Sequence, residues 1–149
     1  MTSSILLDPM VNVLAGSADF GRAWLALGII FGVHVIDEAL HDFLDWYNPV
    51  AKRIRGRLGG LPFPPVFTFW PWFLGLAFVT AAFLFATPIA YQGRAWLRPV
   101  AIAFALINIF NGLLHLVAAV VLRRAVPGVL SAPVLVAVSV WLFHAAAHL

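Results

Sequence analysis

Apolar residues fill four long stretches of the chain, and short segments rich in charge, glycine or proline separate them. The stretches cover about residues 21–46, 66–89, 96–122 and 129–148. Each has roughly the 20 residues that an α-helix needs to cross a hydrocarbon core about 30 Å thick. The pattern therefore predicts an all-α integral membrane protein, built as a four-transmembrane-helix antiparallel bundle.

The first 20 residues differ from the four apolar stretches. They contain no basic residue, and Asp8 and Pro9 interrupt their short apolar patch. A secretory signal peptide begins with a basic segment, so this stretch does not match one. We expect residues 1–20 to be a lead-in or an interfacial segment, and residues 21–149 to form the four-helix transmembrane domain.

Prolines and glycines mark the expected helix ends. Asn48-Pro49 should end the first helix, because the proline ring disfavours helical geometry in the residue before it. A proline cluster at 62–65 follows Gly59-Gly60, and this composition is typical of a loop. Pro127-Gly128 predicts a turn before the fourth helix.

The composition supports the membrane assignment. Hydrophobic residues make up 63% of the chain and charged residues only 10%, whereas a soluble domain has about 25% charged residues. The absence of cysteine removes disulfides and sulfur-ligated metals from consideration. The basic residues cluster in loops and do not form a spread basic face, so we expect the lipid bilayer as a partner and no nucleic acid.

The distribution of basic residues predicts the orientation. Six of the nine Lys and Arg residues lie in loops 47–65 and 123–128. Cytoplasmic loops carry an excess of basic residues. We therefore expect both loops in the cytoplasm and both termini outside.

Polar residues of the first predicted helix concentrate between His34 and Asp45. This stretch holds four of the six acids and two of the five histidines of the chain. If it is one helix, four residues share a face: His34, Glu38, His41 and Asp45. Asp37 lies beside that face. Ionisable groups inside a membrane span cost several kcal/mol unless they are paired, so this stretch is the candidate functional site.

The third predicted helix carries a second polar stripe. Asn108, Asn111 and His115 have spacings of three and four residues and share a face. At about 1.5 Å per residue their depth overlaps that of His34 and Glu38. We expect the two stripes to face each other, where each polar group finds a partner. Interhelical hydrogen bonding without a catalytic role remains the competing interpretation for Asn111 and His115.

The remaining polar residues are interpreted more conservatively. Asp42 and Asp45 lie near the predicted interface, where solvated charge is normal. We assign Asn108, His41 and His144 to substrate binding. For His41 a solvated interfacial position, and for His144 a single satisfied histidine, stay open as alternatives.

Three short motifs resemble those of the HXXEE-domain membrane proteins. His34-Val35-Ile36-Asp37-Glu38 resembles the signature, with aspartate in place of the first glutamate. The segment from Asn111 to His115 is similar to the NxxxH motif of that family. The segment from Ala125 to Gly128 resembles its YxPG turn, with alanine in place of tyrosine. The resemblance implies a small multi-span membrane protein and leads us to expect an enzyme.

The preferred functional hypothesis is acid–base catalysis on a lipophilic substrate. Removal from water favours the neutral form of a carboxyl group, so such a group can hold and donate a proton near neutral pH, and a nearby histidine can relay it. Such a site suits isomerisation, cyclisation or epoxide opening of an isoprenoid- or sterol-like molecule. The expected catalytic residues are His34, Asp37, Glu38, Asn111 and His115.

Two alternatives to this function remain open. The oligomeric state is also open, and a homo-oligomer is one possibility. The acid–base hypothesis requires no cofactor. Glu38 and His41 have ExxH spacing, and with His34 and His115 they offer a nitrogen and oxygen shell for one zinc or iron ion, as in a metal-dependent hydrolase or oxygenase. A non-enzymatic proton-coupled carrier or accessory subunit is the other alternative. The chain shows no internal repeat of the kind common in carriers.

Overall fold

The structure is a computed structural model that describes the backbone of residues 3–149 and the side chains from Ala15 onward. In this part of the chain every regular element is an α-helix, which confirms the all-α class. The helices are α1 (Ser3–Leu40), α2 (Phe43–Arg57), α3 (Phe69–Phe85), α4 (Thr87–Tyr91), α5 (Leu97–Leu122) and α6 (Ala132–Ala147). Three segments are long and apolar enough to cross a membrane: Ala15–Leu40, Phe69–Tyr91 and Leu97–Leu122.

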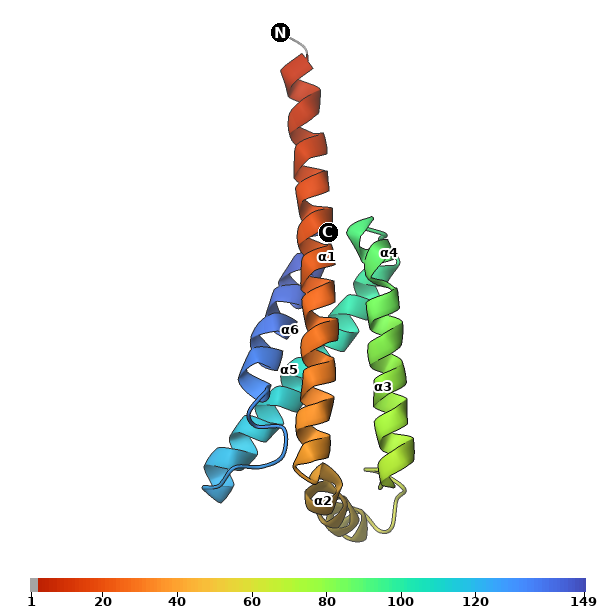
Figure 1. The fold of residues 1–149 in the computed structure, drawn as a ribbon, viewed down its shortest axis with the longest axis vertical. Helices are drawn as coiled ribbons and strands as arrows, with labels where there is room; N and C mark the ends of the chain where they lie inside the picture. The colour runs from red at the N-terminus through yellow and green to blue at the C-terminus, as the bar shows by residue number, and fades with distance from the viewer. Residues whose placement is uncertain (1–2) are drawn as a thin grey trace.

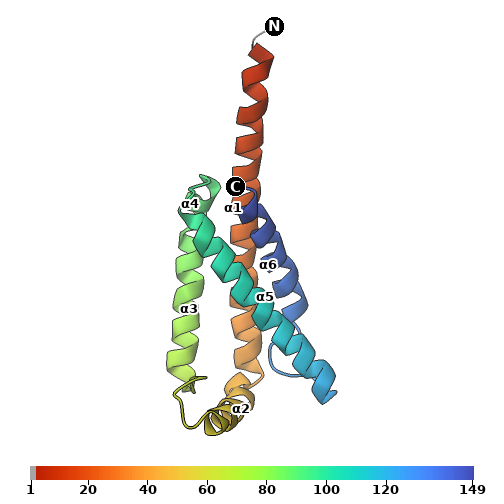
Figure 2. The same ribbon diagram turned by 180° about the vertical axis from the view of Figure 1, so that it is seen from behind.

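Helix α1 is the centre of the arrangement. In Figures 1 and 2, α6 lies along one side of α1, α3 lies along the other, and α5 runs diagonally from α4 past α6. Phe20, Trp24 and Leu27 of α1 are fully buried in the core. The Trp24 indole stacks on the Phe83 ring with 3.8 Å between ring centroids and donates a hydrogen bond to the Phe83 carbonyl. These contacts join α1 to α3.

A close contact between α5 and α6 sets the position of the second polar stripe, which lies on α5. Gly112 of α5 faces α6 so closely that a Cβ there would lie 2.6 Å from Cγ2 of Val136. Ala101 and Ala105 on the same helix are also fully buried. Small residues allow helix backbones to approach closely in membranes. His115, one turn after Gly112, is thereby held beside the start of α6.

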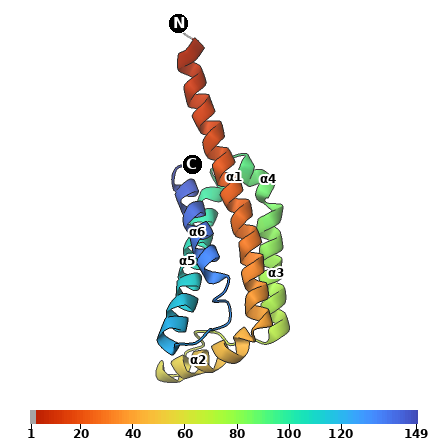
Figure 3. The same ribbon diagram turned by 60° about the vertical axis from the view of Figure 1, so that its left-hand side comes forward.

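The stretch from His34 to Asp45 is not one helix, and this prediction was wrong. Helix α1 ends at Leu40, and Asp42 has a φ of 54°, in the left-handed region. Aspartate is among the few residues that adopt this conformation readily. Helix α2 then runs across the end of the bundle (Figures 1 and 3). His41 and Asp45 therefore do not continue the face that carries His34 and Glu38.

Pro49 does not end a helix, contrary to expectation, because it lies inside α2. A proline within a helix removes one backbone hydrogen bond, which would have joined its N–H to the carbonyl four residues earlier. That carbonyl belongs to Asp45, and both Asp45 and Pro49 are exposed. The unpaired carbonyl is thus accessible, and much of the predicted loop 47–65 is helical.

The two ends of the chain also differ from the predicted boundaries. Helix α1 begins at Ser3, so the predicted lead-in is helical from residue 3 and continuous with α1, while residues 1–2 lie outside the described part. The helix extends beyond the other helices (Figures 1 and 3). Helix α6 has 16 residues, about 24 Å at the usual rise, which is shorter than a typical span. It begins at Ala132 because residues 123–131 first return toward the middle of the bundle.

Candidate functional site

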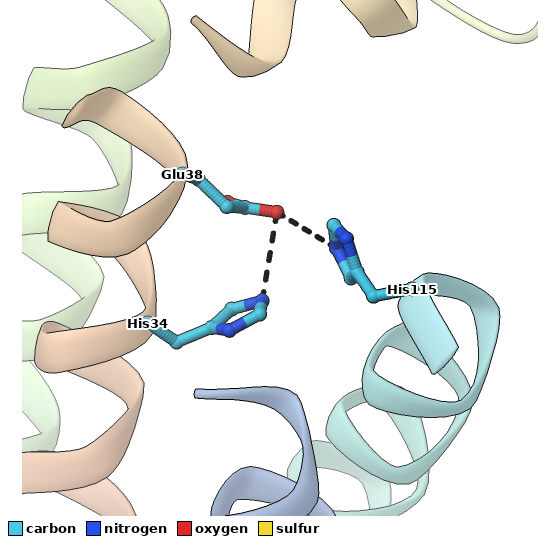
Figure 4. Close-up of side chains that lie close together, drawn as sticks. All are labelled: His34, Glu38 and His115. Atoms are coloured by element: carbon cyan, nitrogen blue, oxygen red, sulfur yellow. Dashed lines mark ion pairs between the residues drawn. The ribbon is translucent and has the colours of Figure 1, made fainter. Parts of the chain in front are cut away.

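Two histidines and one glutamate form a buried cluster between α1 and α5. His34 and Glu38 lie one turn apart on α1, and His115 extends toward them from α5 (Figure 4). Oε1 of Glu38 lies 3.0 Å from Nε2 of His115 and 3.5 Å from Nε2 of His34. The three residues are 0%, 3% and 3% exposed in the order His34, Glu38, His115. One carboxylate oxygen therefore faces two imidazole rings in a space closed to water on most sides.

Ser131 determines which nitrogen of neutral His34 carries the proton. The Ser131 Oγ–H donates to Oδ2 of Asp37 at 2.6 Å, and the Ser131 N–H donates to the same oxygen at 3.0 Å. Oγ of Ser131 also lies 2.8 Å from Nδ1 of His34. A hydroxyl has one proton to donate, and its shortest contact is with Asp37, so Oγ accepts a proton from the His34 Nδ1–H. Nε2 of His34 is then an unprotonated acceptor.

The Asn111 side chain agrees with this assignment. Its Nδ2 lies 3.0 Å from Nε2 of His34. An amide NH₂ only donates, so the neutral imidazole accepts at that nitrogen. The lone pair of His34 Nε2 is therefore directed into the space that also contains Glu38 and His115.

The Pro127-Gly128 turn closes the cluster from a third direction. Gly128 has a φ of +80°, and a Cβ at this position would lie 2.9 Å from Cε1 of His115 and 3.0 Å from Cε1 of His34. Only glycine accepts both the backbone conformation and the close approach. The HxxDE, NxxxH and Pro-Gly segments thus meet at one point, although they are far apart in the chain.

Comparison with known families confirms the family that the sequence resembles. A family model described as "Protein of unknown function with HXXEE motif" matches residues 24–142. The chain belongs to the HXXEE family. No curated protein and no solved structure matches it. In this member of the HXXEE family, the matched region contains every residue of the cluster.

Several residues predicted for the site lie outside the cluster. The Asp37 carboxylate is turned toward Ser131 and His41, and Oδ1 of Asp37 lies 2.9 Å from Nδ1 of His41. The His41 side chain is 52% exposed. His41 therefore lies apart from the other three predicted metal ligands and pairs with Asp37 instead. His144 is exposed, contacts His148 near the end of α6 and does not line the pocket described below.

Two site residues were missed in the sequence. Ser131 was not singled out, although it is the only hydroxyl residue between the Pro-Gly turn and α6. Gly128 was recognised only as part of a turn and not as a contact of both histidines. A hydroxyl residue close after the Pro-Gly motif is the signal that would have identified Ser131.

An apolar pocket of about 560 Å³ opens beside the cluster, a size typical of small-molecule sites. It lies between α1, α3, α5 and the start of α2. Its polar lining comes from Glu38, Asn108 and Asn111 together with Tyr47. The apolar lining residues are Phe31, Phe43, Phe67, Trp72, Leu76, Val79, Phe104, Ile107, Phe110 and Leu114. Glu38 therefore belongs both to the cluster and to the pocket wall.

The pocket faces the side of the bundle between α3 and α5. These helices touch where the Phe83 and Phe104 rings pack with 4.5 Å between centroids, and they diverge toward α2 (Figure 2). Three lining residues at the divergence, Val79, Ile107 and Phe110, are exposed on the surface of the bundle.

Tyr47 lines the α2 end of the pocket, and burial raises the pKa of its phenol above the ordinary value of a tyrosine. The phenol therefore stays protonated and donates to the Pro65 carbonyl.

Proposed function

We propose that this protein is a membrane-embedded enzyme that performs acid–base chemistry on a lipophilic molecule at the cluster of His34, Glu38 and His115. The observation that carries the proposal is that Glu38 belongs both to the cluster and to the wall of the pocket. Its carboxylate contacts both imidazoles and also lines an apolar pocket that faces the side of the bundle. A molecule in that pocket has its hydrocarbon part among apolar side chains and its reacting group beside a proton donor and acceptor.

The chemistry follows from the hydrogen-bonded pair of Glu38 and His115. At 3.0 Å the two groups share one proton between them, and a positioned donor or acceptor of this kind contributes about 10²- to 10⁴-fold to a reaction rate. Isomerisation, cyclisation and epoxide opening each need a proton given at one atom and taken at another. The unprotonated His34 Nε2 supplies a second acceptor. These are the reaction classes that the cluster suits best, on isoprenoid- or sterol-like substrates.

A purely structural role explains the cluster less well. Buried ion pairs add little net stability compared with well-packed apolar residues. Two helices in a membrane can be joined by small residues and single hydrogen bonds, and Gly112 already provides a close contact of this kind. Three ionisable side chains beside a pocket therefore favour a functional site.

The proposal includes a membrane arrangement with four spans. Residues 125–131 return into the bundle and, together with α6, complete the fourth crossing. Irregular backbone at membrane depth is tolerated where protein covers it or where it lines a cavity, and Val126 and Ser131 are buried. Loop 47–65 and Arg123-Arg124, at the start of loop 123–128, lie on the cytoplasmic side and both termini outside, as the basic residues indicate.

Comparative lipid analysis tests the proposed function. Cells expressing the natural chain, Glu38→Gln or His41→Gln are extracted with organic solvent, and the extracts are compared by mass spectrometry. We expect at least one lipophilic species whose abundance changes with the natural chain and with His41→Gln but not with Glu38→Gln. His41 is the matched control because it is a neighbouring histidine that lies outside the cluster. Identical extracts from the natural chain and Glu38→Gln, at equal expression, would contradict the proposal.

A further inference from the structure

We propose that His34, Glu38 and His115 bind one zinc ion, and that with the ion bound a water molecule on it takes over the proton transfer that the proposed function assigns to the three side chains. The role given to the water rests on the proposed function, whereas the binding of the ion stands on geometry alone. Each of the three residues offers one ligand atom, and these atoms all lie within 4.8 Å of one another.

Two of the three distances between the ligand atoms are close to those around a tetrahedral ion. Zinc bonds to imidazole nitrogen and carboxylate oxygen are about 2.0–2.2 Å long, so neighbouring ligand atoms in a tetrahedron are separated by roughly 3.3–3.6 Å. Oε1 of Glu38 lies 3.5 Å from Nε2 of His34 and 3.0 Å from Nε2 of His115. The first distance lies within this range and the second is a few tenths of an ångström shorter, while the two imidazole nitrogens lie within 4.8 Å of each other. An ion therefore fits between the three atoms once the side chains adjust.

The hydrogen bonds of His34 prepare it as a ligand. A metal-bound histidine usually donates its second N–H to a carboxylate or another acceptor, which fixes the tautomer and the orientation of the ring. Here the Nδ1–H donates to Ser131, and Ser131 donates to Asp37. The free lone pair is on Nε2, the nitrogen that faces Glu38. An ion would replace the contact of Asn111 with this nitrogen and leave the amide to bond a ligand of the metal.

The surroundings of the cluster favour zinc as the ion. Three protein ligands and one open position are typical of catalytic zinc sites. Gly128 contacts both imidazoles on one side, while Glu38 and Asn111 line the pocket on the other. The open position therefore faces the pocket, where a substrate would meet the metal-bound water. Two histidines and one carboxylate also bind iron in sites with several open positions, so the experiment below compares the two metals.

Metal binding by the purified full chain in lipid nanodiscs tests this inference. The protein is treated with a chelator, desalted and titrated with Zn²⁺, and bound metal is counted after a second desalting step. We expect one zinc per chain. Co²⁺ in its place should give the intense visible absorption of a tetrahedral site. Fe²⁺ is titrated in parallel, and tighter binding of iron than of zinc would overturn the choice of ion.

The variants separate this site from other metal-binding groups. Glu38→Gln and His115→Gln should each weaken zinc binding by more than 100-fold, while His41→Gln and His144→Gln leave it unchanged. Ser131→Ala keeps all three ligands and should weaken binding by about 10- to 100-fold, as expected for a residue that orients a ligand. If Glu38→Gln does not fold, as judged by its helical circular dichroism, His115→Gln and Ser131→Ala still provide the test.

Two further results would overturn the inference: no zinc bound by the natural chain, or equal losses in Glu38→Gln and His41→Gln. These results are distinct from failure of the proposed function. If lipid changes depend on Glu38 but the chain binds no metal, the proposed enzymatic function stands and the zinc site is refuted. If the chain binds one zinc but the lipid extracts do not change, the zinc site stands and the proposed enzymatic function is refuted.

Discussion

Gly128 lies against the ring of His115 so closely that a Cβ at residue 128 would stand 2.9 Å from Cε1 and 3.0 Å from Nδ1 of that ring. The same Nδ1 is buried without a hydrogen-bond partner among the described residues. The Pro-Gly turn therefore fixes the His115 ring by contact and not by hydrogen bonding. Nε2, the other nitrogen of the ring, is left for Glu38.

Replacing Gly128 by alanine should destabilise the protein more than its backbone conformation alone explains. Gly59 is the matched control, because it has a similar positive φ of +71° with nothing within 4 Å of a Cβ. Left-handed geometry costs a non-glycine residue about 1–2 kcal/mol, and overpacking costs about 1–3 kcal/mol more. We expect a lower thermal midpoint for Gly128→Ala than for Gly59→Ala in the same detergent. Equal midpoints would show that the ring moves aside at little cost.

The hydrogen bonds of Ser131 predict the tautomer of His34. In the neutral ring the proton should be on Nδ1, because Ser131 accepts there and Asn111 donates to Nε2. Nitrogen-15 NMR of histidine-labelled protein distinguishes the tautomers, and the signal is assigned by its absence from His34→Gln. In Ser131→Ala the signal should shift toward a mixture of tautomers, while Ser139→Ala, at a buried serine within α6, should leave it unchanged. A neutral His34 protonated on Nε2 in the natural chain would refute this assignment.

The contact between the polar stripes of α1 and α5 could be predicted from the sequence. Helical spacing placed Asn111 and His115 on one face, and the membrane thickness placed them at the depth of His34 and Glu38. A polar group in a hydrocarbon core needs a partner, which left few arrangements. The structure has these contacts, between Asn111 and His34 and between His115 and Glu38.

The break after Leu40 and the role of Ser131 could not be predicted in this way. Asp42 is compatible with both a helix and a left-handed turn, and the choice depends on α2 packing across the end of the bundle. Ser131 is one hydroxyl in an apolar segment and gives no periodic signal. Its contacts with His34 and Asp37 arise because residues 123–131 return into the bundle, which is a property of the tertiary structure.

Filling the pocket should reduce its occupancy by lipophilic molecules. Val79 of α3 lines the pocket and is 38% exposed, so Val79→Trp has room to place its ring across the opening without disturbing the core. Leu74→Trp is the control, because Leu74 is exposed on the same helix and does not line the pocket. We expect about tenfold less co-purified lipid by native mass spectrometry for Val79→Trp, equivalent to about 1.4 kcal/mol. Equal amounts in both variants would place the lipid elsewhere.

The proposed orientation predicts which loops can be labelled from outside. The chain has no cysteine, so single introduced cysteines report without background. Leu61 and Ala95 are exposed and lie in non-helical segments at opposite ends of α3. Gly93, in the same connection as Ala95, is unsuitable for an introduced cysteine, because its φ is +62° and a Cβ there would collide with the Ser17 side chain. An impermeant thiol reagent applied to intact cells should label Ala95→Cys and not Leu61→Cys, and the reverse pattern would invert the topology.

Glu38→Gln separates a working acid–base centre from a structural one. The amide keeps the shape of the carboxylate and still accepts a hydrogen bond from Nε2 of His115, but it cannot give or take a proton. Because buried carboxylates rarely add net stability, we expect the thermal midpoint to stay within a few degrees of the natural value. The rate of lipid conversion should fall by about 10²-fold or more, the usual size of a general acid–base contribution.

The control for this substitution is Asp42→Asn. Asn adopts the left-handed conformation of Asp42 as readily as Asp does, and Asp42 is exposed, so neither stability nor turnover should change. If Glu38→Gln unfolds while Asp42→Asn does not, the carboxylate is needed for folding and the catalytic interpretation loses its main support. A folded Glu38→Gln protein with full turnover would exclude Glu38 from catalysis. The cluster would then have no carboxyl group to act as the acid, because no other carboxylate among the described residues contacts both His34 and His115.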